Sequence, residues 1–354
     1  NSYYQMKECA NALPYYLRAA DIMEFTGDSA SLINTYSRIA ECYHNEKVYS
    51  KEAAYHKKIL LLGDPQDLNT MIYHIEQTGQ AFMLNDKPDS ALTYFHRFNN
   101  LLQKNELNNK TALISLIRIH RLKEHYDSCL FYSTRLLLQY EKEKKYREMF
   151  SVKNNIGYYF TLNQEYDTAF QTYSEAIEIG EKAGIKNSEK ANLLTNMGVC
   201  LQNMNKTARA ISYFKNGLSI LEEEDQPSER SKIENILALI YYHQNDLYNA
   251  GTFSLESIES ARKANDPVRL ANAYYTYSNI LKAGNEPMKA LDNYEKYLHI
   301  RDSLEIQHQL KQQELERKKE ALEKEENELQ LRLKEERVNE LALQQLNLQL
   351  EKEE

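Results

Sequence analysis

A motif of three residues recurs along this chain at an almost constant interval, and this regularity constrains the fold more than any other feature. In its clearest copies an alanine is followed four residues later by an aromatic residue, and three residues after that by a small one, as in Ala169, Tyr173 and Ala176. Spacing this regular predicts a chain of repeated structural units. The first members of the copies lie 38 to 41 residues apart, at Ala12, Glu52, Ala91, Cys129, Ala169, Ala210, Ala250 and Ala290.

A small residue precedes the motif by twelve positions in most units. Around this residue apolar side chains recur three and four residues apart, as at Leu194, Met197 and Leu201, which is typical of one helix face. Pro88 and Pro287 lie just before the motif, where a proline suits the first turn of a second helix. Each unit is therefore predicted to be two helices, with Pro65, Pro227 and Pro267 at the joints between units. The small residue lets the two helices approach closely, and it is Ala40, Gly79, Gly157, Gly198, Ala238 or Ser278.

These residues resemble the tetratricopeptide repeat, whose pattern has Leu-Gly and an aromatic in a first helix and Ala, Phe and Ala in a second. The match is best in residues 153–176 and 194–217, and it covers residues 1–300. The period of about 40 resembles the longer-repeat branch of the family, although Lys153 and Glu234 replace the aromatic of the first helix. A HEAT array shares the period and is the structural alternative, but it does not predict the Gly and Ala positions.

The resemblance implies an all-α fold, an α-α superhelix of about seven to eight helical hairpins over residues 1–300. The first hairpin is expected to be truncated, because the motif at Ala12 has no room for a full partner helix before it. Stacked hairpins of this kind curve and leave a concave groove lined by their first helices.

The last part of the chain, residues 301–354, is predicted to be one long charged helix. No Gly or Pro interrupts it, and acid-first pairs such as Glu314 with Lys318 support an exposed helix. Two interpretations remain open: a coiled coil that forms a homodimer, and a single solvated helix. In the first, the pairing residues would be the leucines of the second half of this helix, namely Leu329, Leu343, Leu346 and Leu350.

The composition argues against several classes of function. A net charge of −8 disfavours a nucleic-acid surface in this region, and four widely separated cysteines without a CxxC motif give no metal site. No phosphate-binding loop, HExxH or nucleophile elbow occurs, and the nine histidines are scattered along the sequence. We therefore expect no enzyme activity and no cofactor.

The repeat register also predicts which side chains face the groove. On each first helix, the positions that do not face the core are mainly Asn and Tyr. Thr195 lies on the same face. Asn matches both the C=O and the N–H of a peptide unit, and Tyr adds flat contact area, so the partner is expected to be an extended peptide or protein segment. Two arginines are expected to anchor a carboxylate. The predicted groove residues are Arg118, Arg121, Asn154, Tyr158, Asn192, Asn196, Asn235, Tyr242, Asn272, Tyr275 and Asn279.

The resemblance extends to bacterial membrane-anchored regulators in which such an array and a charged helix precede a membrane span. It implies the extracytoplasmic sensor part of a signalling or transcription regulator, on the periplasmic side of the inner membrane, with a span just beyond Glu354. The alternatives are a soluble cytoplasmic adaptor or peptide receptor that dimerises through its C-terminal helix, and a scaffold without a ligand. Nothing in the 354 residues fixes the ligand or the output module.

Overall fold

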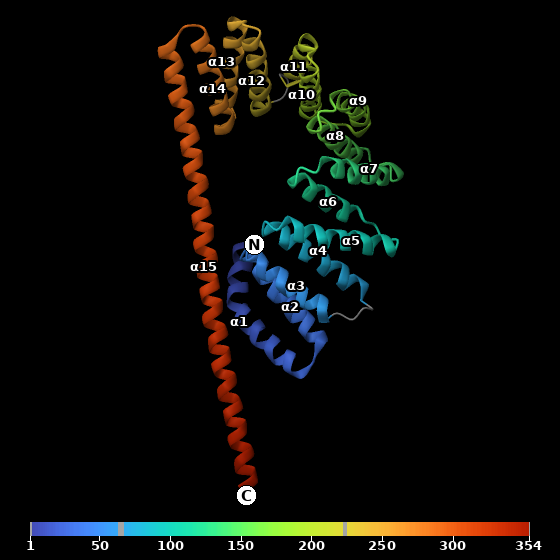
Figure 1. The fold of residues 1–354 in the computed structure, drawn as a ribbon, viewed down its shortest axis with the longest axis vertical. Helices are drawn as coiled ribbons and strands as arrows, with labels where there is room; N and C mark the ends of the chain where they lie inside the picture. Colours follow the sequence, from blue (N-terminus) through green and yellow to red (C-terminus); the bar gives the residue numbers. More distant parts are fainter. Residues whose placement is uncertain (1, 63–66, 222–224, 354) are drawn as a thin grey trace. The chain divides into compact units, whose positions relative to one another are not determined.

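The computed structural model describes the backbone of residues 2–62, 67–221 and 225–353, and this part of the chain is built of helices joined by short turns (Figure 1). The side chains of residues 2–8, 10–11 and several after residue 318 lie outside the description, as does Pro65. The helices run as follows: α1 Ser2–Thr26, α2 Ser29–Asn45, α3 Tyr49–Leu62, α4 Leu68–Leu84, α5 Pro88–Lys104, α6 Lys110–Leu122, α7 Tyr126–Lys142, α8 Tyr146–Leu162, α9 Tyr166–Ala183, α10 Asn187–Asn203, α11 Thr207–Leu221, α12 Pro227–His243, α13 Leu247–Lys263, α14 Pro267–Ala283 and α15 Pro287–Glu353.

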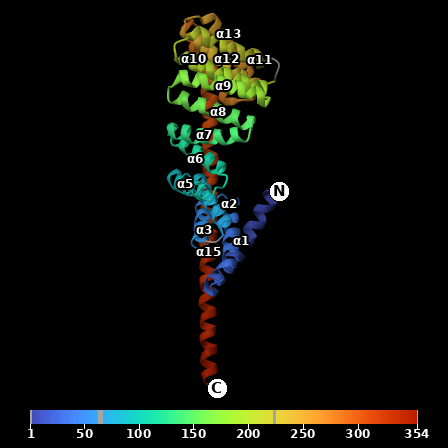
Figure 2. The same cartoon turned by 90° about the vertical axis from the view of Figure 1, so that its right-hand side faces the viewer.

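The chain divides into two compact units, which are described separately. Unit 1 contains residues 1–119 and 310–354, and unit 2 contains residues 120–309. Consecutive helices pack against each other from α1 to α5 in unit 1 and from α7 to α14 in unit 2. Figure 2 shows α7, α8 and α9 of unit 2 following one another in chain order. The all-α prediction is confirmed, with helices in consecutive pairs as in a solenoid.

The hairpins are packed by a small residue of the first helix set against a ring of the second helix. A Cβ added to Gly157 would lie 2.6 Å from Cε1 of Tyr173, which stands sixteen residues later on the second helix. Gly198 bears the same relation to Phe214, at 2.7 Å, and Gly79 to Phe95, at 3.0 Å. These rings are fully buried, so the predicted close approach of the two helices is confirmed where the small residue is glycine.

In two hairpins the small residue is alanine, and the residue sixteen positions later is smaller than Phe or Tyr. Ala40 corresponds to His56 and Ala238 corresponds to Ser254, and both of these second-helix residues are buried. A serine or an imidazole occupies less volume than the ring of Phe or Tyr. In these hairpins the size of the first-helix residue and that of its partner vary together. The hairpin of Ser278 differs, because the residue sixteen positions later is Tyr294, which is 39% exposed.

The turns between helices share one backbone conformation. At the end of α7, the N–H of Lys145 donates to the carbonyl of Tyr140 and the N–H of Lys144 donates to that of Glu141. This is the Schellman arrangement, in which the residue just past the helix is left-handed. That residue is not glycine in ten of the described turns: Lys47, Asp86, Glu106, Glu124, Lys144, Gln164, Asn205, Asn245, Asn265 and Asn285.

The final helix, α15, contains both the second helix of the last predicted hairpin and the predicted long charged helix. It is a single element of 67 residues (Figure 1). It begins at Pro287 as the second helix of the hairpin opened by α14, and Ala290 of the repeated motif is buried there. Pro88 begins α5, as predicted for a proline in the first turn of a second helix. Pro227 and Pro267, predicted at the joints between units, begin the first helices α12 and α14. Further along, α15 exposes large apolar side chains, among them Ile306, Leu310, Leu331, Val338 and Leu343.

Candidate functional site

The first helices of the hairpins in unit 2 form a continuous row. Helix α10 contacts both α8 and α12, and α12 also contacts α14. We call the polar residues predicted on these four helices the first-helix face. Its members are Asn154 and Tyr158 on α8, Asn192 and Asn196 on α10, Asn235 and Tyr242 on α12, and Asn272, Tyr275 and Asn279 on α14.

The first-helix face lies outside the packed core. The rings of Tyr158 and Tyr275 are each 46% exposed, and Asn272 is also exposed. The other members are half-buried. By contrast, apolar neighbours on the same helices such as Ile156 and Leu193 are buried. Each first helix therefore packs an apolar face inward and carries amide and phenol groups on the remaining surface.

Two members of this face have an amide oxygen without a hydrogen-bond partner among the described residues. The Oδ1 atoms of Asn154 and Asn235 are buried, and neither has a hydrogen-bond partner among the described residues. Both residues stand three positions before the small residue of their helix. Buried polar atoms are usually paired, so an unpaired amide at the same position of two repeats is not explained by packing.

Thr195 corrects part of the prediction. It stands at the equivalent position on α10, but it is 1% exposed, and its hydroxyl donates to the carbonyl of Ala191 at 2.8 Å. A threonine satisfies its own hydroxyl within the helix in this way, whereas an asparagine at the same position does not. Thr195 is therefore part of the packed structure.

The two predicted arginine anchors are exposed on α6, but they fall in different units. Arg118 belongs to unit 1, and Arg121 belongs to unit 2. Their role toward a carboxylate stays a prediction. On α15, the proposed pairing residue Leu343 is 61% exposed, and the side chains of Leu329, Leu346 and Leu350 lie outside the described residues.

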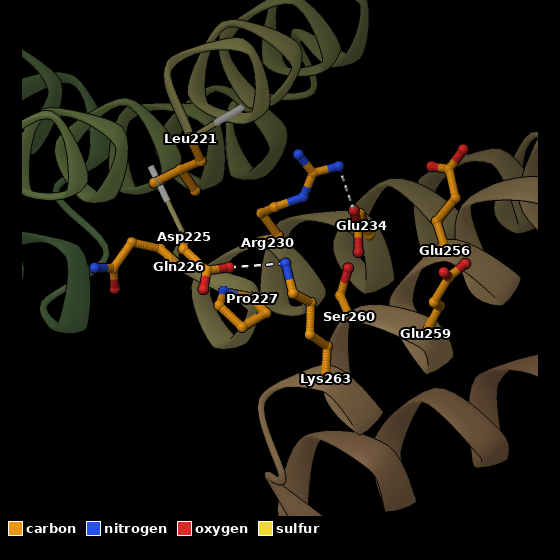
Figure 3. Close-up of a pocket in the computed structure, with 10 residues that line it drawn as sticks. All are labelled: Leu221, Asp225, Gln226, Pro227, Arg230, Glu234, Glu256, Glu259, Ser260 and Lys263. Carbon is orange, nitrogen blue, oxygen red and sulfur yellow. Dashed lines mark hydrogen bonds and ion pairs between the residues drawn. The ribbon is translucent and has the colours of Figure 1, made fainter. Parts of the chain in front are cut away.

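Unit 2 contains a polar pocket of about 580 Å³ between α12, α13 and the end of α11 (Figure 3). Lys263 donates to Asp225 at 2.8 Å across one side of it, and Glu256 and Glu259 project beside one another from α13. Four carboxylates and two cations line the pocket, so its described charge is −2 when all of them are ionised. The complete lining is Leu221, Asp225, Gln226, Pro227, Arg230, Glu234, Glu256, Glu259, Ser260 and Lys263.

Glu234 is the buried acid of this pocket. It is 1% exposed, its Oε1 accepts from Arg230 at 3.3 Å, and its Oε2 is buried without a hydrogen-bond partner among the described residues. Burial raises the pKa of Glu234, and Glu256 adds to this effect, while Ser260 and Arg230 oppose it. The sequence singled out this residue only as a departure from the repeat pattern. Its place in a pocket depends on the packing of α12 against α13, and the sequence periodicity of α12 does not predict that packing.

Unit 1 contains a cluster that the sequence analysis missed. Three of the nine histidines lie together in space: His44 and His56 contact Glu52, and His74 contacts His56. Nδ1 of His44 lies 3.1 Å from Oε1 of Glu52, and the Nδ1 atoms of His56 and His74 lie 3.0 Å apart. Glu52 and His56 occupy the alanine and aromatic positions of the repeated motif, which is why both are buried. In the sequence, this cluster was indicated by the weak copy of the repeated motif that begins at Glu52.

Burial dominates the protonation of this cluster. It lowers the pKa of His56 to about 3, with further lowering by His74 and His44, and it lowers the pKa of His74 to about 4. Burial raises the pKa of Glu52, and His44 opposes that change. Both buried imidazoles are therefore neutral at pH 7, and one of the facing Nδ1 atoms can donate to the other.

Three further observations on the described residues bear on function. Within the part of the chain that the structure describes, no group of three or more His, Cys, Asp or Glu side chains is arranged to hold a metal ion. The four cysteines are free thiols. Among the described helices, none offers a stretch that is long and apolar enough to cross a bilayer.

Comparison with known proteins agrees with this architecture. The model of the tetratricopeptide repeat family matches residues 148–223, which include α9 and α10. A tetratricopeptide repeat protein from Parabacteroides merdae is similar over 76% of this chain and 93% of its own, with a TM-score of 0.53 at 14% identity.

A second solved structure is a signal transduction ATPase with numerous domains from Pyrococcus horikoshii, which has a tetratricopeptide repeat sensor. It is similar over 87% of this chain and 49% of its own length, with a TM-score of 0.59 at 13% identity. No curated protein sequence matches this chain. The period, the helix pairs and these likenesses agree: the chain carries tetratricopeptide repeats and has the fold of a tetratricopeptide-repeat array.

Proposed function

We propose that this chain is a non-catalytic binding array and that it holds an extended segment of a peptide or protein along the first-helix face. The observation that carries the proposal is the pair of unsatisfied amides, Asn154 and Asn235, at equivalent positions of α8 and α12. The Oδ1 atoms of these half-buried residues have no partner within the described fold, so a side-chain rotation that turns each amide toward a bound peptide breaks no internal hydrogen bond of that oxygen.

The chemistry of the face suits a peptide backbone. An asparagine amide donates and accepts, as a peptide unit does, and its partners on an extended chain recur along the strand. Tyr158 and Tyr275 add exposed aromatic area at small cost in side-chain entropy. Because the amides and phenols are distributed over four stacked helices, the ligand is expected to cross several repeats.

The test uses a random peptide library displayed on phage to find a ligand, followed by Asn154→Ala combined with Asn235→Ala. The double variant removes two unsatisfied amides, so its melting temperature should stay the same or rise while the affinity falls by about tenfold or more. The matched control is Gln171→Ala with Asn216→Ala, two exposed amides on the second helices α9 and α11. Equal affinities for the two double variants would refute the proposed face.

We further propose that the array is the sensor part of a membrane-anchored signalling or transcription regulator, on the periplasmic side of the inner membrane. The second helix of the last hairpin is the start of α15, so a change in the array has a covalent route along that helix. The name of the Pyrococcus protein assigns a sensor role to its own repeats, which supports the proposal.

Fractionation of the source cells tests this location. The native protein should sediment with membranes, and a protease added to spheroplasts should cleave it. A product that stays in the soluble fraction and is protected until lysis would favour the cytoplasmic adaptor instead.

A further inference from the structure

Two hairpins of unit 2 carry the same pair of glutamates on the second helix. Glu175 and Glu178 stand six and nine residues after Ala169 on α9, and Glu256 and Glu259 stand six and nine residues after Ala250 on α13. All four are exposed. The two hairpins can therefore be compared position by position.

In the α8–α9 hairpin the chain supplies its own cation to this position. Nζ of Lys153, four residues before the small residue Gly157, lies 2.5 Å from Oε2 of Glu175. The lysine is mostly covered, with its side chain 20% exposed, so the stem packs between the helices and the ammonium group meets the carboxylate.

In the α12–α13 hairpin the residue equivalent to Lys153 is Glu234, four positions before Ala238. The internal cation is thus replaced by a third carboxylate. Arg230 and Lys263 are engaged with Glu234 and Asp225, and among the described side chains neither Glu256 nor Glu259 forms an ion pair. Glu234 also lines the pocket, but its carboxylate is buried and is already paired with Arg230 through Oε1.

We propose that this pocket receives the guanidinium group of an arginine side chain from a bound peptide, at the place that Lys153 fills in the other hairpin. This proposal rests on the proposed function, because it assigns the side chain that the array selects. A guanidinium carries five donors in a planar fork and can serve Glu256 and Glu259 together, because these two carboxylates project beside one another. A volume of about 580 Å³ leaves room for the group.

The direct test compares two capped peptides, acetyl-Gly-Arg-Gly-amide and the same peptide with citrulline, which has nearly the same shape and no charge. Binding to the whole chain is measured by saturation-transfer NMR. We expect the arginine peptide to bind at least about tenfold more tightly, because only its charge complements the pocket. Equal signals from both peptides, or no signal from either, would overturn the proposal.

Variants locate the site. Glu256→Gln with Glu259→Gln, both at exposed positions, should abolish the preference for arginine, whereas Glu175→Gln with Glu178→Gln at the same positions of α9 should keep it. Glu234→Lys should reproduce the α8–α9 arrangement, pair with Glu256 and block the peptide with no loss of melting temperature. An arginine preference that survives the α13 double variant would place the site elsewhere.

The two proposals fail separately. If library peptides bind the first-helix face but show no preference for arginine at any position, the array remains a peptide receptor and the pocket loses its assigned role. If the arginine peptide binds in the pocket but Asn154→Ala with Asn235→Ala has no effect on any ligand, the first-helix face is the part that fails.

Discussion

Gly157 has no side chain, and the ring of Tyr173 fills the space where one would lie. A methyl group there cannot be accommodated by a small rotation, because the ring is itself fully buried between two helices. Gly251 lies inside α13 in the opposite situation, with no atom within 4 Å of the place where a Cβ would be built. The two glycines therefore separate the packing effect of a methyl group from its effect on helix propensity.

Gly157→Ala should lower the free energy of unfolding by about 1–3 kcal/mol, since overpacking outweighs the gain of about 1 kcal/mol in helix propensity. Gly251→Ala should raise it by up to about 1 kcal/mol. Urea unfolding followed by circular dichroism measures both. A stabilised Gly157→Ala variant would mean that the two helices are not as close as described.

The histidine cluster makes stability depend on pH, and the sign follows from its lowered pKa values. His56, at about 3, and His74, at about 4, bind protons less readily in the fold than in the unfolded chain, where the value is about 6.5. Their contribution is complete above pH 6.5 and is lost as the pH falls toward 4. At pH 5 the loss is about 2 kcal/mol for each histidine. Glu52, whose pKa is raised, offsets part of it.

His74→Leu should reduce this pH dependence. Leucine is the residue at the equivalent position of α10, where Leu193 is buried, so the variant is expected to fold. Its free energy of unfolding should fall less between pH 7.5 and pH 5 than that of the unmodified chain, by about 2 kcal/mol. His299→Gln, at an exposed position of α15, is the control and should leave the difference unchanged.

At the scale of helices and turns, the sequence predicts where the elements lie better than how they end. The motif residues Ala91, Ala169, Ala210 and Ala250 mark the second helices because each is buried at the fourth position of its helix. The turns are harder to predict, since Gly and Asn are the residues expected in a left-handed conformation. Asn205, Asn245, Asn265 and Asn285 follow that rule, but the lysine and glutamate turns do not.

Lys144→Gly should therefore stabilise the chain. Lys144 has φ of 53°, a conformation that costs a residue with a side chain about 1 kcal/mol relative to glycine. Asn205→Gly, at φ of 59° in the α10–α11 turn, should gain less because asparagine tolerates this region. Thermal unfolding of the two variants in parallel tests the difference, and a loss of stability in Lys144→Gly would contradict the prediction.

The sites were less predictable than the helices for a physical reason. The first-helix face follows from one helix and its register, so Tyr158 and Tyr275 could be placed from the sequence alone. The cluster around Glu52 and the pocket at Glu234 require contacts between residues of two or three helices, and periodicity within one helix carries no information about them. In both places a polar residue at a core position of the motif was the visible sign.

At the scale of the whole molecule, α15 carries the predicted surface for pairing with a second copy of the chain. Leu331, Val338 and Leu343 are exposed on its second half, and such side chains favour pairing with a second copy. We expect the chain to be a dimer in light scattering and a variant ending at Asn339 to be a monomer. A full chain that already scatters as a monomer would exclude the coiled coil.

Because α15 is both the closing helix of the last hairpin and a single uninterrupted helix, we expect it to act as a lever. Its 67 residues extend about 100 Å, so a tilt of roughly 5° where α14 and α15 meet becomes a displacement of about 9 Å at the far end. A sub-ångström rearrangement at the seam between two helices would thus be magnified into a motion large enough to separate or join whole protein domains.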